Sequence, residues 1–255
     1  MAEASDRQAQ HYDRILSEYD RHYYDAQSTA YRERFIIGPL VEGLDLNGLE
    51  VADLACGSGE TSLSLRRRFP AIRTTGFDIS PRACETYQAK VERPCQVLDL
   101  TQPQDGLEPR FDAAIVMGGL HHCVADLDRT FSNIAALLKP AAPLMFFEPN
   151  RDYFLQFARD LWYRVDGYFD AATEDGLAHG DLLRRAGAAF TPERVRYFGG
   201  PAFFLIYNSL VFRIPHGLKR AIAPPLMAME AGFNALPGKQ LFSSFTARWR
   251  RSGSS

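Results

Sequence analysis

Cysteine and long apolar runs are both scarce in this chain. Its 255 residues include four cysteines, scattered without a CxxC pair, so neither a zinc site nor a disulfide framework is indicated. The longest apolar stretches fall well short of the ~20 residues that a bilayer span requires. The first twenty residues are polar and lack the apolar centre of a signal peptide. A protein of the reducing cytoplasm, without a transmembrane segment, is therefore expected.

A strong charge of either sign is also lacking. The formal net charge is −2 and the isoelectric point is near 6.3. The one short basic run, Arg66-Arg67-Arg68, is better explained as the solvated end of a helix than as a nucleic-acid site. A hydrophobic content of 46% is enough for the core of one catalytic domain. Nucleic acid is therefore not an expected partner.

The most informative segment is EVADLACGSGE, from Glu50 to Glu60. It is typical of a buried strand that enters a glycine turn, and Asp78 follows nineteen residues after Gly59. A parallel strand that ends in glycines lets the backbone approach a ligand that a Cβ would exclude. An acid about 20 residues later, at the tip of the next strand, can accept both hydroxyls of a ribose. The pairing predicts a nucleoside cofactor.

Two details favour S-adenosylmethionine over a dinucleotide. The third glycine of the dinucleotide pattern is replaced by Ser62. Asp53, within the turn region, would repel a diphosphate but suits a ligand that carries an ammonium and a sulfonium. Two alternatives stay open: an NAD-dependent oxidoreductase, which shares the strand, turn and ribose acid, and a non-catalytic scaffold that keeps the cofactor site.

Five segments, in order over about residues 47 to 150, resemble the class I S-adenosylmethionine-dependent methyltransferases, and the small-molecule branch of that family in particular. They are DLACGSG at 53–59, TGFDIS at 75–80, QVLDL at 96–100, the strand and loop at 111–123, and LLKPAAPLMFFE at 137–148. The resemblance implies that Asp78 binds the ribose and that Asp99 faces the adenine amino group. The full cofactor site that it implies comprises Asp53, Ala55, Cys56, Gly57, Gly59, Asp78, Ile79, Asp99, Leu100 and Met117.

The chain departs from the family pattern at two glycine positions. Ala55 stands where the first glycine of the motif is usual, and Ala141-Ala142 replaces the glycine pair that follows Lys-Pro. Alanine keeps the site small but disfavours positive φ. We therefore expect a turn at Ala55 that an ordinary residue can adopt.

Strand and helix alternate along the chain, which is typical of a parallel sheet covered on both faces. The predicted fold is α/β: a doubly wound, mostly parallel, seven-stranded sheet of the Rossmann-like methyltransferase type, in a domain over residues 47–255. Its ligand site is expected at the carboxyl ends of the strands. The seven strands are predicted near 49–54, 73–77, 95–98, 112–117, 143–148, 193–198 and 241–249.

Residues 1–46 are predicted to form an N-terminal helical cap, which in the resembling family often covers the cofactor. One amphipathic helix is expected around Tyr12 to Tyr19, and another over 28–41 with Ser28 as its N-cap. A helical insert follows at about 150–175, where Phe154 and Phe157 begin an apolar face.

A second insert, at 199–238, is predicted as an apolar helical hairpin before the last strand. Pro201 is expected to open its first helix and Pro225 its second. We expect this hairpin to wall a lipophilic acceptor site with Phe203 and Phe233. Ordinary core packing and a homodimer interface are the alternatives for the same apolar faces.

Candidate catalytic residues lie at the tips of the fourth and fifth strands. Histidine can accept a hydroxyl proton near neutral pH, and His121 and His122 are adjacent here. His122 matches a histidine of the resembling family and is the first candidate base, although a structural role against the cofactor is equally open. Glu148 is a further catalytic candidate, and Asn150 is expected to bind the acceptor.

No metal is expected at this site. Asp126 and Asp128 are better explained as the start of a helix, and no second group of acids and amides stands nearby to hold a divalent ion. The sequence thus favours transfer of a methyl group from S-adenosylmethionine to a small, lipophilic molecule, with O-methylation ahead of N- or C-methylation.

Overall fold

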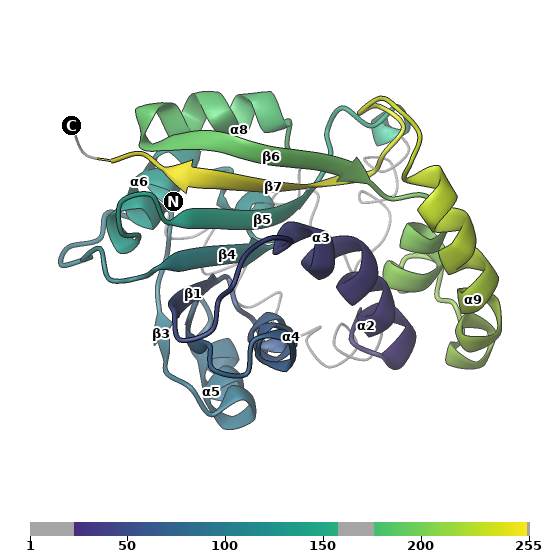
Figure 1. The fold of residues 1–255 in the computed structure, drawn as a ribbon, viewed down its shortest axis with the longest axis horizontal. Helices are drawn as coiled ribbons and strands as arrows, with labels where there is room; N and C mark the ends of the chain where they lie inside the picture. The colour runs from purple at the N-terminus through teal and green to yellow at the C-terminus, as the bar shows by residue number, and fades with distance from the viewer. Residues whose placement is uncertain (1–22, 158–175, 254–255) are drawn as a thin grey trace.

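A seven-stranded sheet forms the centre of the computed structural model, which describes residues 23–157 and 176–253 (Figure 1). The strand order is β3-β2-β1-β4-β5-β7-β6; β7 is antiparallel to both of its neighbours, and the other pairs are parallel. The predicted mostly parallel seven-stranded sheet is confirmed. The strands are β1 (Glu50–Leu54), β2 (Arg73–Asp78), β3 (Cys95–Val97), β4 (Ala113–Met117), β5 (Pro143–Pro149), β6 (Phe190–Phe198) and β7 (Ser244–Arg251).

Alternation along the central strands places apolar side chains on both faces of the sheet. In β1, Val51 packs with α4 on one face, whereas Ala52 and Leu54 belong to the core under α6 and α8 on the other. Trp249 of β7 is fully buried in this second core. The main helices are α4 (Glu60–Arg68), α5 (Pro81–Val91), α6 (Leu127–Leu137) and α8 (His179–Ala186), with 3₁₀ turns η2 (Leu120–Cys123) and η3 (Gly187–Ala189).

The helical segment before β1 consists of α2 (Ala26–Arg32), the π-helical turn η1 (Glu33–Ile37) and α3 (Gly38–Leu40). Phe35, Ile36 and Leu40 are buried, as predicted. The predicted cap residue is wrong: Asp25, not Ser28, accepts from the first backbone N–H groups, and the Ser28 hydroxyl donates to the Ile206 carbonyl instead. The predicted helix around Tyr12 to Tyr19 lies outside the described residues.

The second insert contains the π-helical turn η4 (Phe203–Tyr207) and α9 (His216–Phe233). In Figure 1, α2 and α9 both lie beyond the carboxyl ends of the parallel strands. The predicted helix start at Pro225 is wrong, because α9 begins at His216 and continues through Pro224 and Pro225. A proline inside a helix removes a backbone hydrogen bond, whereas a proline in the first turn does not. The sequence pattern therefore indicated that a helix begins at Pro225.

Exposure along the inserts also differs from the predicted pattern. Met229 and Leu236, placed on the buried face of the hairpin, are about half exposed, at 55% and 48%. Phe154 and Phe157 of the first insert are exposed, while the rest of its predicted helix, 158–175, lies outside the described residues. Within the described ranges, no helix is both long and apolar enough to cross a membrane.

Two alanines occupy the left-handed region that favours glycine. The φ angle is 51° at Ala55 and 62° at Ala141, so the expected ordinary turn at Ala55 is wrong. The physical reason at Ala55 is its neighbour: a Cβ on Gly119 would lie 2.6 Å from the Ala55 Cβ, so the missing side chain of Gly119 leaves room for the alanine methyl. The left-handed conformation of Ala55 is thus tolerated because Gly119, which lies opposite, has no side chain to clash with the alanine methyl group.

Ala141→Gly is expected to stabilise the fold. The left-handed conformation costs an L-residue roughly 1–2 kcal/mol, and glycine removes this cost. Glycine also makes the unfolded chain more flexible, which offsets part of the gain, so the net stabilisation should be about 0.5–1 kcal/mol. Differential scanning calorimetry would measure the rise in Tm. Ala221→Gly, on the exposed side of α9, is the matched control and should lower Tm. An equal fall in both variants would contradict the strain assigned to Ala141.

Candidate functional site

The glycine turn after β1 lies beside the acid at the end of β2. Gly57 and Gly59 have φ angles of 52° and 87°. The Gly57 N–H donates to Asp78 Oδ2 at 2.9 Å, and Asp78 Oδ1 accepts from the Ser80 N–H at 3.0 Å. A Cβ on Gly57 would meet no atom within 4 Å, whereas one on Gly59 would lie 2.3 Å from Val91. Gly59 is therefore needed for packing, and Gly57 leaves the backbone open beside Asp78.

Asp53 is buried under this turn with one oxygen engaged. Its Oδ2 accepts from the Ser62 N–H at 3.1 Å and from the Ser62 hydroxyl at 2.7 Å, and that hydroxyl also contacts the Tyr87 hydroxyl at 2.7 Å. Within the described ranges Oδ1 has no hydrogen-bond partner. Burial raises the pKa of Asp53 to about 7, although the Ser62 contacts oppose the shift. Ser62, at the place of the third glycine, thus anchors a carboxylate that keeps one acceptor for a ligand.

Arg32 is a site residue that sequence reasoning missed. It comes from α2, is 4% exposed, and donates from Nη2 to the Thr61 hydroxyl at 2.5 Å in the first turn of α4. Its charge lowers the pKa of Asp53. Its spacing from Phe35 and Ile36, three and four residues on, was the available signal, because it places Arg32 on their buried helix face.

These groups fit S-adenosylmethionine. An unused carboxylate oxygen on Asp53 suits an ammonium, and the Arg32 guanidinium at the start of α4 suits a carboxylate. Those are the two charges of an amino-acid head. Asp78, beside the exposed backbone of Gly57, suits ribose hydroxyls.

The other predicted cofactor residues divide between the ligand side and the core. Asp99 follows β3, and its Oδ1 accepts from the Thr101 N–H at 2.9 Å and the Thr101 hydroxyl at 2.7 Å. The side chains of Cys56 and Leu100 belong to the core clusters, so only their backbone would face a ligand. Ile79 and Met117 are half-buried.

Glu148 organises the loop at the tip of β4. It is fully buried, and its Oε1 accepts from the N–H groups of Gly119 at 3.1 Å and Leu120 at 2.7 Å. Its Oε2 accepts from the His121 N–H at 3.3 Å and lies 2.7 Å from His121 Nδ1. Burial raises the pKa of Glu148 to about 8, against the lowering effect of the three backbone groups. The carboxyl group therefore fixes both the loop and the ring of His121.

The two histidines lie together, with ring centroids 3.8 Å apart. The structure thus brings His121, His122 and Glu148 to one place, as predicted from their positions at neighbouring strand tips. The carboxyl group pairs with His121, however, which the sequence had ranked second.

Asn150, predicted to bind the acceptor, is engaged by protein groups in this structure. It is fully buried, its Nδ2 donates to the carbonyls of Lys239 and Phe242 at 2.9 and 2.8 Å, and its Oδ1 accepts from the Asp152 N–H at 3.1 Å. The amide holds the loop before β7 and is engaged by backbone groups, so it is not available to an acceptor.

Phe203 and Phe233, the two phenylalanines predicted to wall the acceptor, both have aromatic contacts. Phe203 is 4% exposed and lies among the rings of Tyr31, Phe198 and Tyr207. Phe233 is half-buried, with its ring centroid 5.5 Å from that of Phe242. These contacts favour core packing, the alternative given for this insert, and the acceptor wall stays a prediction.

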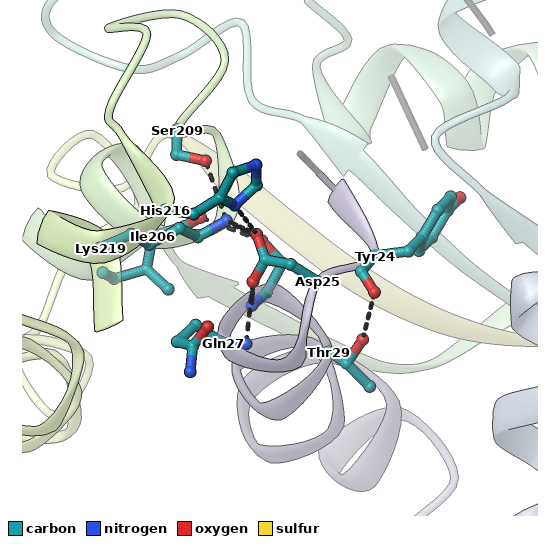
Figure 2. A network of polar contacts seen from close by, with 9 residues as sticks. Tyr24, Asp25, Gln27, Thr29, Ile206, Ser209, His216 and Lys219 are labelled. Carbon is teal, nitrogen blue, oxygen red and sulfur yellow. Dashed lines mark hydrogen bonds and ion pairs between the residues drawn. The ribbon is translucent and has the colours of Figure 1, made fainter. Parts of the chain in front are cut away.

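Two buried charges of α9 connect it to α2 and η4. Lys219 is fully buried; it pairs with Asp25 and donates to the hydroxyls of Ser28 and Ser209 at 2.6 and 2.9 Å (Figure 2). Burial lowers the pKa of Lys219, and Asp25 opposes that shift. Ser209 is fully buried as well, and its hydroxyl accepts a hydrogen bond from this ammonium.

Glu230, also fully buried, accepts from the Tyr31 hydroxyl at 2.6 Å and from the N–H groups of Gly200 and Ala202 at 2.9 Å each. The two charges lie three turns apart on α9. The segment Asp25–Arg32 and the insert are thus joined by polar contacts at both ends of α9. In the part of the chain that the structure describes, no three histidine, cysteine or acidic side chains are arranged to hold a metal ion.

Comparisons with known proteins agree with this architecture. A family model for a methyltransferase domain matches residues 52–144. The chain is 35% identical over 125 residues to a 2-phytyl-1,4-naphtoquinone methyltransferase of Trichormus variabilis, covering 44% of this chain and 52% of that protein. It is 31% identical over 117 residues to a ubiquinone biosynthesis O-methyltransferase of Coxiella burnetii, covering 43% and 47%. The chain thus spans about half the length of the curated relatives it matches.

The fold is also similar to a solved structure, that of geranyl diphosphate C-methyltransferase from Streptomyces coelicolor in complex with Mg²⁺, geranyl-S-thiolodiphosphate and S-adenosyl-L-homocysteine. The TM-score is 0.60 at 13% identity, over 87% of this chain and 76% of that one. The glycine turn, the acid at the end of β2, the strand order and these likenesses point the same way. Residues 52–144 thus match a methyltransferase domain, and the chain resembles the class I S-adenosylmethionine-dependent methyltransferases in sequence over that region and in fold.

Proposed function

We propose that the protein transfers a methyl group from S-adenosylmethionine to a hydroxyl group of a small, apolar acceptor. The observation that carries the proposal is the buried pair of opposite charges, Asp53 and Arg32, beside a glycine turn that Asp78 holds by a hydrogen bond. When bound, the cofactor supplies a methyl group already activated on a sulfonium. The remaining task of the protein is to bind both molecules, exclude water and remove a proton.

Three side chains divide the binding of the cofactor. Asp78 accepts from the ribose hydroxyls while it keeps the Gly57 N–H. Asp53 Oδ1 accepts from the ammonium, and Arg32 donates to the carboxylate. Because Arg32 belongs to α2, the segment before β1 acts as a cap in this proposal, with residues 1–46 as its extent.

His121 is the proposed general base, in place of the first-ranked His122. With Glu148 ionised, Nδ1–H of His121 donates to Oε2, and Nε2 is the ring nitrogen that accepts the acceptor's proton. His122, whose ring lies against His121, supports the ring from the side. Glu148 is a positioning residue in this arrangement.

The relatives and the surroundings of the site support an apolar acceptor. Two of the matched proteins are named for methylation in quinone chemistry, 2-phytyl-1,4-naphtoquinone and ubiquinone biosynthesis. Around the tips of β4 and β5 this chain places Met117, Phe147 and Tyr207 in one apolar cluster. O-methylation is favoured because a histidine paired with a buried carboxyl group suits proton removal from a hydroxyl.

Asp78→Ala is expected to weaken binding of S-adenosylmethionine at least tenfold. Each lost charge-assisted hydrogen bond is worth about 1.5–3 kcal/mol, and tenfold in Kd corresponds to about 1.4 kcal/mol. Isothermal titration calorimetry would measure the change, with Asp45→Ala as an exposed control. Unchanged affinity in a folded Asp78 variant would place the ribose elsewhere.

Thermal shift would test the proposed function as a whole. S-adenosylmethionine at 100 times its Kd should stabilise the wild type by about 2.7 kcal/mol, whereas NAD should leave Tm unchanged. A shift with NAD alone would favour the oxidoreductase alternative. Binding of S-adenosylmethionine without turnover of any acceptor would favour the scaffold.

A further inference from the structure

Tyr207, the last residue of η4, ends an aromatic cluster beside the tips of the strands. It is 9% exposed, and its ring is stacked on that of Tyr31 at a centroid distance of 5.5 Å. The rings of Tyr23, Phe203 and Phe147 lie 5.6, 5.6 and 6.1 Å away. Four rings thus fix the Tyr207 side chain, so its hydroxyl has a defined position.

The hydroxyl groups of Tyr207 and of its neighbour Tyr31 differ in their hydrogen bonds. Tyr31 donates to Glu230 at 2.6 Å, but within residues 23–157 and 176–253 the Tyr207 hydroxyl has no hydrogen-bond partner. This hydroxyl is not among the fully buried polar atoms that lack a partner in the described ranges, so it keeps contact with its surroundings and can reach a ligand. Burial raises the pKa of Tyr207, so the phenol keeps its proton near neutral pH and is a donor. The charge of Arg32 lowers the same pKa, but burial has the larger effect.

The proposed base also lies near Phe147. A Cβ on Gly118 would lie 3.8 Å from His121 Cε1 and 3.8 Å from Phe147 Cδ1. Phe147 forms an edge contact with the Tyr207 ring. The apolar ring of Phe147 is therefore a common neighbour of the donor Tyr207 and the proposed proton acceptor His121.

We propose that Tyr207 is an acceptor-binding residue whose hydroxyl donates a hydrogen bond to a second oxygen of the methyl acceptor. This inference rests on the proposed function and narrows its substrate class to a flat, apolar ring that carries two oxygen substituents. His121 Nε2 takes the proton of one hydroxyl. That oxygen bonds to the methyl carbon as the carbon–sulfur bond breaks, and the bonding pair remains on sulfur. Tyr207 holds the other oxygen and does not change its protonation.

The test compares two probes that differ in one oxygen, 1,4-dihydroxynaphthalene and 1-naphthol, under anaerobic conditions. Tyr207→Phe should lower kcat/KM for the diol by about 5- to 20-fold and that for 1-naphthol by no more than twofold. Affinity for S-adenosylmethionine should stay within twofold. Because the hydroxyl has no protein partner, Tm should equal or exceed that of the wild type.

Tyr31→Phe is the matched control, since its hydroxyl serves Glu230: it should lower Tm and leave the ratio of the two kcat/KM values unchanged. Equal losses for both probes in Tyr207→Phe, or no loss for the diol, would overturn the inference. So would a wild type that methylates neither probe. Calorimetric binding of S-adenosylmethionine, measured in parallel, would in that case leave the proposed function standing while the inferred acceptor class falls.

Discussion

His121→Ala lowers kcat by about 10²- to 10⁴-fold and leaves the Kd for S-adenosylmethionine within twofold, because it removes a proton acceptor without touching the cofactor groups. His122→Ala is the matched control. The contact with Glu148 Oε2 is made by Nδ1 of His121 and is kept in this variant. His122→Ala should therefore slow turnover only a few-fold. Single-turnover methylation with saturating cofactor would give both numbers.

The pH profile distinguishes a base from a merely structural histidine. Burial raises the pKa of Glu148 to about 8, so below that pH the pair holds a second proton, Oε2–H faces Nδ1, and the His121 proton moves to Nε2. In that state Nε2 cannot accept. The rate should therefore rise with pH up to about pH 8 in the wild type. A rate in His121→Ala that is low but keeps the same rise, or a larger loss in His122→Ala, would contradict this assignment.

Glu230→Ala should cost about 3–5 kcal/mol of unfolding free energy, which is the scale for breaking a buried charged network. The truncation leaves the Tyr31 hydroxyl and the N–H groups of Gly200 and Ala202 buried without their acceptor. For a chain of this size, Tm should fall by roughly 6 to 20 °C. Differential scanning calorimetry is the measurement.

Two further variants separate charge from shape at this position. Glu230→Gln keeps one acceptor oxygen and should recover part of the loss. Glu42→Ala removes an exposed carboxylate that pairs with Arg194, and it should leave Tm nearly unchanged. A Glu230→Ala protein as stable as the Glu42→Ala protein would mean that the insert is held by its apolar contacts alone.

The sequence predicted the strands and the glycine turn because their signals are local. Alternation identified the faces of the sheet, and the contact between Gly57 and Asp78 follows from two motifs on neighbouring strands. Arg32 was missed because its partner, Thr61, belongs to another helix. Asn150 looked like a ligand for the same reason: its backbone partners at Lys239 and Phe242 are about ninety residues away, so nothing near it in the chain indicates that its amide is engaged.

Other errors came from local preferences that packing overrides. Pro224 and Pro225 indicate the start of a helix, yet α9 begins eight residues before Pro224. The buried contacts of Lys219 stabilise that first part of the helix. Alanine disfavours positive φ, yet Ala55 adopts it beside Gly119. The choice between two adjacent histidines depends on which ring the loop turns toward Glu148, and no pattern in the residues reports that.

Arg32 and Ser28 belong to the same short helix, so one element carries both the proposed cofactor contact and the attachment to α9. A ligand that steadies Arg32 therefore also steadies the Lys219 network and, through η4, the ring of Tyr207. Thermodynamic linkage makes such an effect mutual, so each ligand strengthens the binding of the other. For the proposed function, this linkage predicts that saturating S-adenosylmethionine lowers the Kd of the acceptor, and that the acceptor lowers the Kd of S-adenosylmethionine by the same factor.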